Sequence, residues 1–362
     1  MNQPLRFVTK ILFVAVTLLF VTESFADEGK LKWELKPTGS KASLRGLSTP
    51  SDRAIWACGS NATVIRSEDG GESWIACAPS QFASQEIEFR SIHAWDTKTA
   101  CIATAGTPAV ILRTDNGGLN WSKCYEANSE KAFFDGLRFW DRNRGIAFSD
   151  PVDGRLLIVE TEDGGRHWQP VSDSLLPKAA TGEAGFAASN SSLEIGAEGA
   201  AWIGTGGTEA KQANIYYRQQ FGAHWTPVGC PMPSAAAAGV FSIAASPELL
   251  VALGGDYRPD ANSTITGCFS KDGGRSWSKL EVQPVAFRSA VVGLSTILRF
   301  SRPPWSIRWL AVGPTGSDFS RDGLKWENFS TRGFHALSAA QGEIYAVGSD
   351  GRFAKLEISK PE

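Results

Sequence analysis

Short apolar segments alternate with turn residues along most of the chain. The stretches Glu88–Trp95, Thr99–Gly106 and Ala109–Thr114 follow one another closely, and residues typical of turns separate them. No long apolar stripe recurs with the 3.6-residue period of an amphipathic helix. Segments of this length and spacing predict an all-β chain with four strands in every unit of roughly 50 residues.

One short pattern recurs through the chain: serine or threonine, any residue, Asp or Asn, two glycines and, after two more residues, tryptophan. The copies begin at residues 67, 114, 161, 218, 270 and 320, so successive copies are 47, 47, 57, 52 and 50 residues apart. The copy at 218 is worn and keeps one glycine and the tryptophan, while the copy at 320 is shortened. Self-similarity at this interval predicts a propeller in which each copy joins the third strand of a blade to the fourth.

The chemistry of this box suits a tight turn rather than catalysis. Its two glycines tolerate positive φ, and its Asp or Asn oxygen can accept hydrogen bonds from turn amides. Asn116 replaces Asp in one copy, which suits an acceptor but not a catalytic acid. The indole of each copy is large enough to stabilise the packing between blades. We therefore assign a structural role to the box residues Asp69, Trp74, Asn116, Trp121, Asp163, Trp168, Asp272, Trp277, Asp322 and Trp326.

The two ends of the chain complete the count of blades. Residues 333–358 contain three further strands with no box after them. The stretch "GKLKWEL" at 29–35 resembles "DGLKWEN" at 322–328, so the N-terminal strand should complete the last blade. We expect a seven-bladed β-propeller of four-stranded antiparallel blades over residues 27–362, closed by that strand and thus without free sheet edges. A six-bladed or open ring is the alternative.

The first 26 residues have the pattern of a secretory signal peptide. Arg6 and Lys10 precede the apolar run Ile11–Val21, and Ser24–Ala26 supplies small residues for cleavage. The run is too short to span a bilayer, which takes about 20 apolar residues. Residues 1–26 are therefore predicted to be removed, leaving a secreted or periplasmic protein that does not span the membrane.

Composition narrows the possible partners. A formal net charge of −2 provides no general attraction for nucleic acid. The six cysteines permit three disulfides in an exported protein, but their spacing does not define the pairing. The positions suggest that Cys58 and Cys101, and likewise Cys77 and Cys124, are equivalent in neighbouring repeats. No Cys-x-x-Cys pair occurs, and the four histidines are scattered, so no metal or cofactor is expected.

The boxes and their flanking strands resemble BNR, or Asp-box, repeats. An "FRSI"-type inner strand followed by "ATAG" or "LAVG" is most similar to the photosystem II assembly and stability factors of plants and cyanobacteria and their secreted bacterial relatives. The resemblance to sortilin-type receptors and sialidases is more distant. In these families the box lies away from the functional face. The resemblance implies a scaffold that binds an exported or membrane protein. We expect this scaffold to be a monomer.

The face opposite the boxes can be reconstructed from the repeats. Aligning the inner strands places Arg45, Arg90, Asp135, Ala187, Phe241, Arg288 and His335 in one register. Arginine forks suit carboxylate, sulfate or phosphate, so this ring predicts a site for an anion or an acidic segment. The alternative is that these arginines neutralise loop carboxylates and cap strands. Loop residues Asp150, Glu183, Asp256 and Tyr257 are further candidates for a polar ligand or partner.

Two enzyme classes are the other hypotheses. Three arginines, Tyr257 and several carboxylates are the residue types of a sialidase-like glycoside hydrolase. However, "SLRGL" at Ser43–Leu47 stands where such enzymes carry an "FRIP"-like motif, and Tyr257 has no clear Glu partner. An oxidoreductase is less favoured, because "IGTGGTEA" at 203–210 lacks the last small residue of a dinucleotide loop and does not lie in a βαβ unit. Protein binding is therefore the leading hypothesis.

Overall fold

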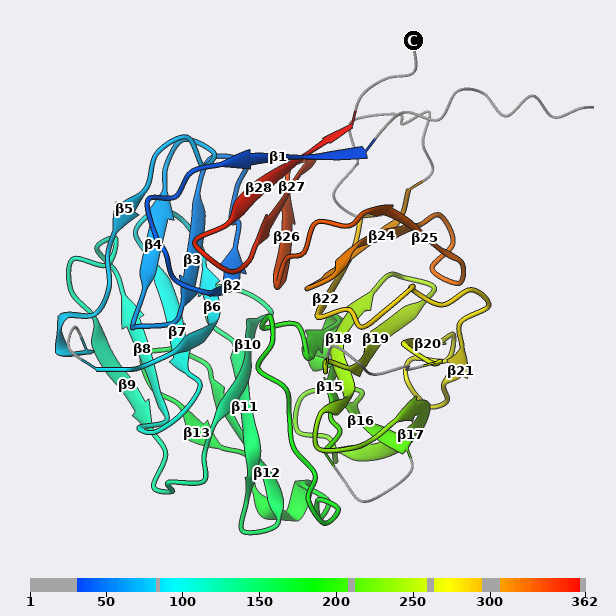
Figure 1. Ribbon diagram of the computed structural model, residues 1–362. Coiled ribbons are helices and arrows are strands. Elements are labelled where there is room, and N and C mark those ends of the chain that lie inside the picture. Colours follow the sequence, from blue (N-terminus) through cyan, green and yellow to red (C-terminus); the bar gives the residue numbers. More distant parts are fainter. Residues whose placement is uncertain (1–30, 83–84, 208–211, 259–263, 295–306, 359–362) are drawn as a thin grey trace, which may run out of the picture.

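The computed structural model describes residues 31–82, 85–207, 212–258, 264–294 and 307–358. Seven four-stranded antiparallel sheets are arranged as blades around a central axis (Figure 1). Besides strands, this part of the chain contains three short 3-10 turns: η1 (Ser80–Phe82), η2 (Asp173–Leu175) and η3 (Ala197–Gly199). The seven-bladed all-β fold expected from the repeats is confirmed.

Each blade uses four consecutive strands, except the last. The first three blades are β2 (Leu44–Ser48), β3 (Ile55–Gly59), β4 (Val64–Ser67), β5 (Ile75–Ala76); β6 (Phe89–Ala94), β7 (Ala100–Thr104), β8 (Val110–Thr114), β9 (Ser122–Glu126); and β10 (Phe134–Phe139), β11 (Gly145–Val152), β12 (Arg155–Thr161), β13 (Gln169–Pro170). The next three are β14 (Leu193–Ile195), β15 (Ala201–Gly204), β16 (Gln212–Arg218), β17 (Thr226–Pro233); β18 (Ala238–Ala245), β19 (Leu250–Asp256), β20 (Gly267–Ser270), β21 (Ser278–Lys279); and β22 (Ala290–Gly293), β23 (Trp309–Gly313), β24 (Gly316–Ser320), β25 (Trp326–Ser330).

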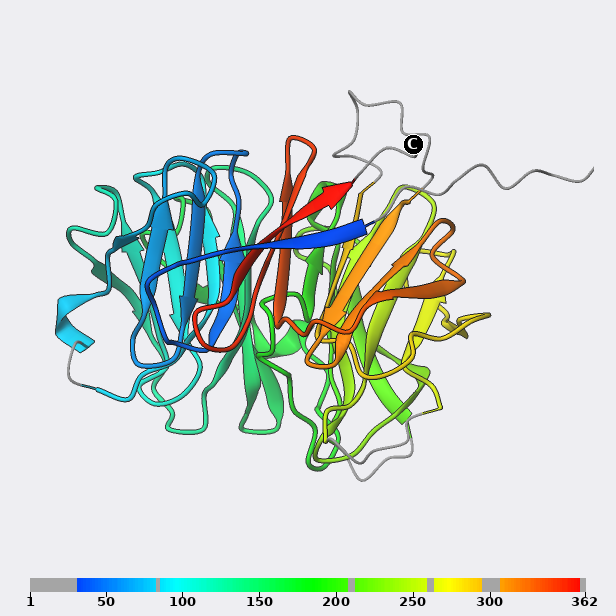
Figure 2. The same cartoon turned by 45° about the horizontal axis from the view of Figure 1, so that its top comes forward.

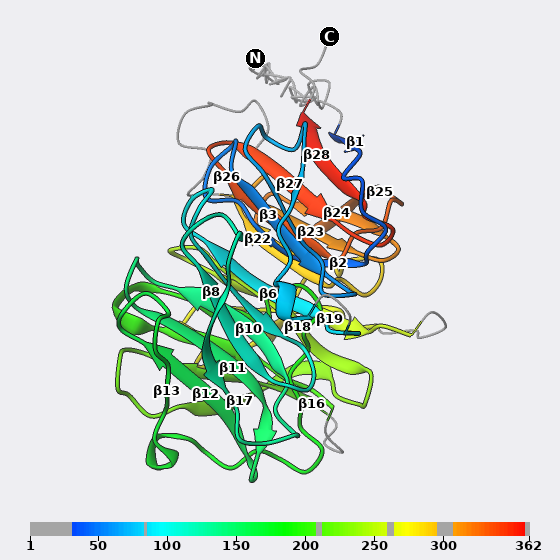
Figure 3. The ribbon, with the colours of Figure 1, turned by 90° about the vertical axis from the view of Figure 1, so that its left-hand side faces the viewer.

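The seventh blade joins the two ends of the propeller. It consists of β26 (Ala336–Ala340), β27 (Glu343–Val347), β28 (Phe353–Ile358) and, as its outermost strand, β1 (Leu31–Lys36). The antiparallel register runs from Leu31 opposite Ile358 to Lys36 opposite Phe353. Figures 2 and 3 show β1 running along β28 at the outer edge of the ring. The predicted closure by the N-terminal strand is thus confirmed.

The hydrophobic core is divided into seven parts, one between each pair of neighbouring blades. The indole of each box packs in the core shared with the preceding blade; Trp121, for example, lies beside Trp56 and donates to the carbonyl of Cys77 at 2.8 Å. In the last blade Trp33 of β1 takes this place and donates to Ser317 Oγ at 2.9 Å. The resemblance of the N-terminal stretch to the sixth box therefore reflects equivalent packing.

Hydrogen bonds within the box explain its sequence. In the first copy Ser67 Oγ accepts from the Gly71 amide at 2.8 Å, and Asp69 Oδ1 accepts from the Ser73 amide at 2.9 Å. Gly70 and Gly71 have φ of 77° and 89°, the left-handed region that glycine tolerates best. Asn116 accepts the corresponding amide of Asn120 at 3.0 Å through its side-chain oxygen. The box carboxylates thus order a turn.

All six cysteines lie within the described residues, and none of them forms a disulfide. Cys58 lies opposite Gly46 of β2, whereas Cys101 lies opposite His93 of β6, two residues further along its inner strand. The proposed equivalence of Cys58 and Cys101 is therefore wrong. The predicted signal peptide, residues 1–26, lies outside the described residues, and no helix within the described part is long and apolar enough to cross a membrane.

Candidate functional site

The innermost strands begin on the face opposite the boxes, and four of them carry a β-bulge near that end. The pairing of β2, β6, β10 and β18 with the next strand skips one residue in each case: Arg45, Arg90, Asp135 and Phe241. A bulge redirects a side chain relative to a regular strand. These four residues therefore share one structural position around the axis, and we call the surface around them the channel mouth.

The guanidinium groups of Arg45 and Arg90 lie near each other at the channel mouth. Arg45 is half-buried and has no hydrogen bond or ion pair among the described residues. Burial and the nearby charge of Arg90 lower the pKa of Arg45. Arg90 forms an ion pair with Glu88, donates to the carbonyl of Ala187 at 3.3 Å and lies over the ring of Phe133. Two cations with one carboxylate between them leave positive charge that an anionic ligand could neutralise.

His335 adjoins this pair just before β26. Its Nε2 lies 2.9 Å from Ser349 Oγ. Burial, reinforced by Arg45, Arg352 and Arg90, lowers the pKa of His335 to about 4. The imidazole is therefore neutral near pH 7, and it contributes a hydrogen-bonding group rather than a third positive charge to the channel mouth.

Asp135 and Asp150 form the acidic side of the channel mouth. Asp135 is 0% exposed, and its carboxylate lies near the Asp150 and Ala187 amides without forming a hydrogen bond of regular geometry. Burial, together with Asp150, raises the pKa of Asp135 well above its ordinary value. Burial also raises the pKa of Asp150 to about 6, although Asp150 accepts from the Gly185 amide at 2.7 Å. Asp135 thus favours the neutral acid, so Glu88 is the carboxylate that pairs with Arg90 and Asp135 adds little negative charge beside it.

Arg288 does not join this cluster. Its side chain is 1% exposed and forms a buried ion pair with Asp318 of β24. The hydrogen bond from the Arg288 amide to Gly254 matches that from Leu44 to Gly348, so Arg288 occupies the buried position before the bulge. The alignment of this repeat was shifted by one residue, and the prediction that Arg288 contacts a partner conflicts with its burial.

Glu183 is likewise buried. Its carboxylate accepts from the Thr205 hydroxyl at 2.6 Å, from Asn214 Nδ2 at 3.0 Å and from the Tyr216 hydroxyl at 2.6 Å. It also accepts from the Ala180 amide. Four donors satisfy both oxygens, so Glu183 ties its loop to the fourth blade rather than offering a charge to a ligand.

The part of the channel mouth formed by blades 4, 5 and 6 is aromatic. Tyr257 is 52% exposed and follows Asp256, whose carboxylate pairs with Arg258. The Tyr257 ring lies 6.0 Å from that of Phe241 and 6.4 Å from that of Phe287. Sequence reasoning did not single out Phe186 or Phe287, although each directly precedes a residue placed in the inner-strand register. These aromatic contacts do not supply the Glu partner that a tyrosine nucleophile needs.

The segment before β14 crosses the axis below the channel mouth. Ser189 Oγ donates to the carbonyl of Ser289 at 2.6 Å, and Ser191 Oγ lies 2.7 Å from Ser242 Oγ. Asn190 accepts from the Leu137 amide at 2.8 Å and donates to the carbonyl of Ile92 at 3.1 Å. Residues 189–191 therefore link blades 2, 3, 5 and 6. The expected central opening is occupied at this level, so the candidate site lies above this segment.

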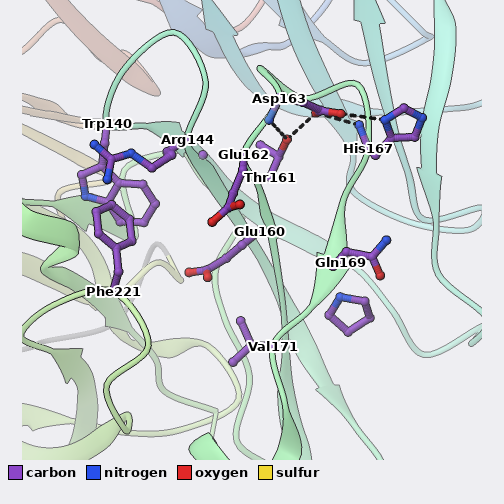
Figure 4. A pocket seen from close by; sticks show the side chains of 12 residues that line it. Trp140, Arg144, Glu160, Thr161, Glu162, Asp163, His167, Gln169, Val171 and Phe221 are labelled. Carbon is purple, nitrogen blue, oxygen red and sulfur yellow. Dashed lines mark hydrogen bonds and ion pairs between the residues drawn. The ribbon is translucent and has the colours of Figure 1, made fainter.

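The box face carries a different concavity, a pocket of about 470 Å³ between blades 3 and 4. Figure 4 shows Glu160 and Glu162 facing the rings of Trp140 and Phe221. Arg218 pairs with Glu160 and lies over both rings, and Arg144 lies over Phe221. A similar pocket of about 450 Å³ lies between blades 4 and 5. Because the chain's own cations occupy the rings and the groove repeats, we assign this pocket to the architecture.

Comparisons with known proteins support the same architecture. Residues 25–131 match the family described as photosynthesis system II assembly factor YCF48. A solved structure of YCF48 bound to D1 peptide has a TM-score of 0.63 at 16% identity, covering 91% of this chain and 97% of that one. YCF48 from Cyanidioschyzon merolae has a TM-score of 0.60 at 17% identity, covering 89% and 98%.

An enzyme shares the fold as well. Virginiamycin B lyase from Staphylococcus aureus has a TM-score of 0.59 at 14% identity, covering 92% of this chain and 100% of that one. No curated protein sequence matches the chain. At these identities a structural likeness shows the fold alone, so the site must be judged from its own residues.

Proposed function

Since the chain is a YCF48-like propeller of BNR repeats, we propose that it is an exported scaffold that binds an acidic segment of a secreted or membrane protein at the channel mouth. In this proposal the boxes build the ring and the opposite face makes the contact. A monomer suffices, because the site lies within one propeller.

The observation that carries the proposal is the half-buried Arg45 beside Arg90. Arg45 forms no ion pair among the described residues, and Glu88, the carboxylate near both arginines, pairs with Arg90. A buried cation is unfavourable unless it is paired, so a carboxylate from a partner would gain a charge-assisted hydrogen bond here. The raised pKa of the buried Asp135 preserves this preference for anions, because a protonated carboxyl does not repel them. The relative described as bound to D1 peptide supports a peptide as the kind of ligand.

The proposal can be tested with the purified protein and a synthetic peptide that carries a cluster of Asp and Glu, titrated by calorimetry. The double variant Arg45→Gln and Arg90→Gln should weaken binding by about 100-fold, at about 1.4 kcal/mol per lost charged contact. Binding to the unaltered protein should also weaken with added salt.

Arg142→Gln is the matched control. This arginine is 73% exposed and lies on the box face, in the connection between β10 and β11. Its loss should leave peptide affinity unchanged. Unaltered affinity in the double variant, or equal loss in the control, would remove the channel mouth as the site. Turnover of an aryl glycoside that is lost in Tyr257→Phe would instead favour the glycosidase hypothesis.

A further inference from the structure

Four aromatic rings form one contact cluster beside the arginines of the channel mouth. Phe186 and Phe241 stack with centroids 3.9 Å apart and planes inclined by 17°. Phe287 meets Phe241 edge-on at 4.6 Å, and Tyr257 completes the group. We call these four residues the aromatic platform. Phe241 is buried at its centre, while the half-buried Phe186 and Phe287 and the exposed Tyr257 surround it.

The ring of Phe186 packs closely against the backbone of two glycines. A Cβ on Gly206 or Gly239 would lie 2.8 Å or 2.7 Å from Cε2 of Phe186, closer than real contacts allow. These two glycines therefore leave the space in which the Phe186 ring is seated. A ring that is already in place loses little conformational entropy when a ligand covers it.

The platform and the arginines form one surface. Arg90 donates to the carbonyl of Ala187, the residue next to Phe186. The bulge position is cationic in blades 1 and 2 and aromatic in blade 5, where Phe241 occupies it. One side of the channel mouth therefore suits a carboxylate, and the adjoining side suits an apolar or aromatic side chain.

We propose that the channel mouth reads two features of a partner at once: a carboxylate on Arg45 and Arg90, and an aromatic side chain a few residues away on the aromatic platform. This inference rests on the proposed function and specifies its ligand class as an acidic segment that contains an aromatic residue. Ring stacking adds to the affinity gained from the buried area alone, so it can select among acidic segments of equal charge.

Three sets of synthetic Gly-Ser peptides test this. The first carries an Asp-Glu pair and one Trp at varied distances from it, the second has Ser in place of Trp, and the third has Asn-Gln in place of Asp-Glu. The best Trp peptide should bind the unaltered protein about tenfold more tightly than its Ser counterpart, which corresponds to about 1.4 kcal/mol. The Asn-Gln peptides should bind weakly.

Protein variants distinguish binding of the carboxylates at the arginines from binding of the aromatic side chain at the aromatic platform. Tyr257→Ala changes an exposed side chain and should remove most of the preference for Trp while retaining affinity for the Ser peptide. Leu119→Ser, which alters an 82% exposed residue of the second box on the other face, is the control and should change neither affinity. Arg45→Gln should weaken both acidic peptides.

The outcomes are distinguishable. Equal binding of the Trp and Ser peptides, with no effect of Tyr257→Ala, would overturn the aromatic platform as a recognition element and leave the proposed acidic site intact. Failure of every acidic peptide to bind would overturn both. A Trp preference that survives in Tyr257→Ala but disappears in Leu119→Ser would place recognition on the box face and also overturn the inference.

Discussion

The Arg218 guanidinium in blade 4 lies 2.5 Å from the Glu160 carboxylate in blade 3, and the Arg218 side chain is only 1% exposed. Arg218 stands at the first position of the worn box, where other copies carry Ser or Thr. It also donates to the carbonyl of Gly199 and lies over the rings of Trp140 and Trp225. In this blade a buried cation between rings has replaced the hydroxyl and carboxylate of the usual turn.

Removing Arg218 should therefore destabilise the propeller. Arg218→Met leaves Glu160 half-buried without its cation, which should lower the free energy of unfolding by about 3 kcal/mol. Adding Glu160→Gln should recover much of that loss, because the stranded charge is then gone. Urea unfolding followed by tryptophan fluorescence measures both values. A double variant as unstable as the single one would contradict this account of the pair.

The box carboxylates should make stability depend on acid. Hydrogen bonds from the Ser276 and Ser270 hydroxyls lower the pKa of Asp272 from 3.8 to about 2. Because the folded state binds this proton less readily than the unfolded chain, the stabilisation is complete above pH 3.8 and is lost as the pH falls towards 2. Asp272→Asn keeps an acceptor oxygen, as Asn116 does in the second box, but loses the negative charge. It should therefore weaken this acid dependence and lower the Tm at pH 7 modestly.

Thermal unfolding measured across that pH range tests this prediction. The Tm difference between the unaltered protein and Asp272→Asn should be larger at pH 7 than at pH 2. Parallel curves, separated by the same Tm difference at every pH, would show that Asp272 has no linked proton.

The axial segment should contribute strongly to stability. Asn190 adopts φ of 64° and bridges blades 2 and 3 through buried hydrogen bonds. Asn190→Ala leaves the Leu137 amide without its acceptor and should cost about 2–3 kcal/mol by chemical denaturation. Asn61→Ala is the control: Asn61 has φ of 56° but is exposed. Equal losses at the two positions would mean that backbone strain, rather than bridging, explains the effect.

His335 should report occupancy of the channel mouth. Its pKa of about 4 reflects burial and the repulsion of Arg45, Arg352 and Arg90. A bound carboxylate offsets that repulsion, so the pKa of His335 should rise on binding an acidic peptide. NMR titration of the imidazole with and without saturating peptide measures the change. The peptide's own carboxylates protonate in the same pH range. Peptide must therefore stay saturating throughout the titration, and an unchanged pKa of the imidazole under that condition would place the peptide elsewhere.

The propeller fold could be predicted from the sequence because every blade has the same local structural requirements. Gly70 and Gly71 must accept positive φ, Asp69 must accept turn amides, and Trp74 must fill a core between blades; these demands recur at each copy, so they appear as a repeat. Closure was readable for the same reason, since Trp33 meets the packing demand of a box tryptophan. Where local backbone geometry or packing requires a particular residue type, that requirement can be recognised in the sequence.

The channel mouth was readable only in part, because it depends on contacts between segments far apart in the chain. Arg45, Arg90 and Asp135 could be aligned, since bulges place them at one position. Arg288, however, lies one residue before the bulge position and is buried against Asp318, and no feature of the neighbouring sequence indicates this. Likewise, nothing near Asn190 indicates that it crosses the axis to meet Ile92 and Leu137. Side-chain direction and burial there arise from how seven blades pack together, and that information exists only once the chain has folded.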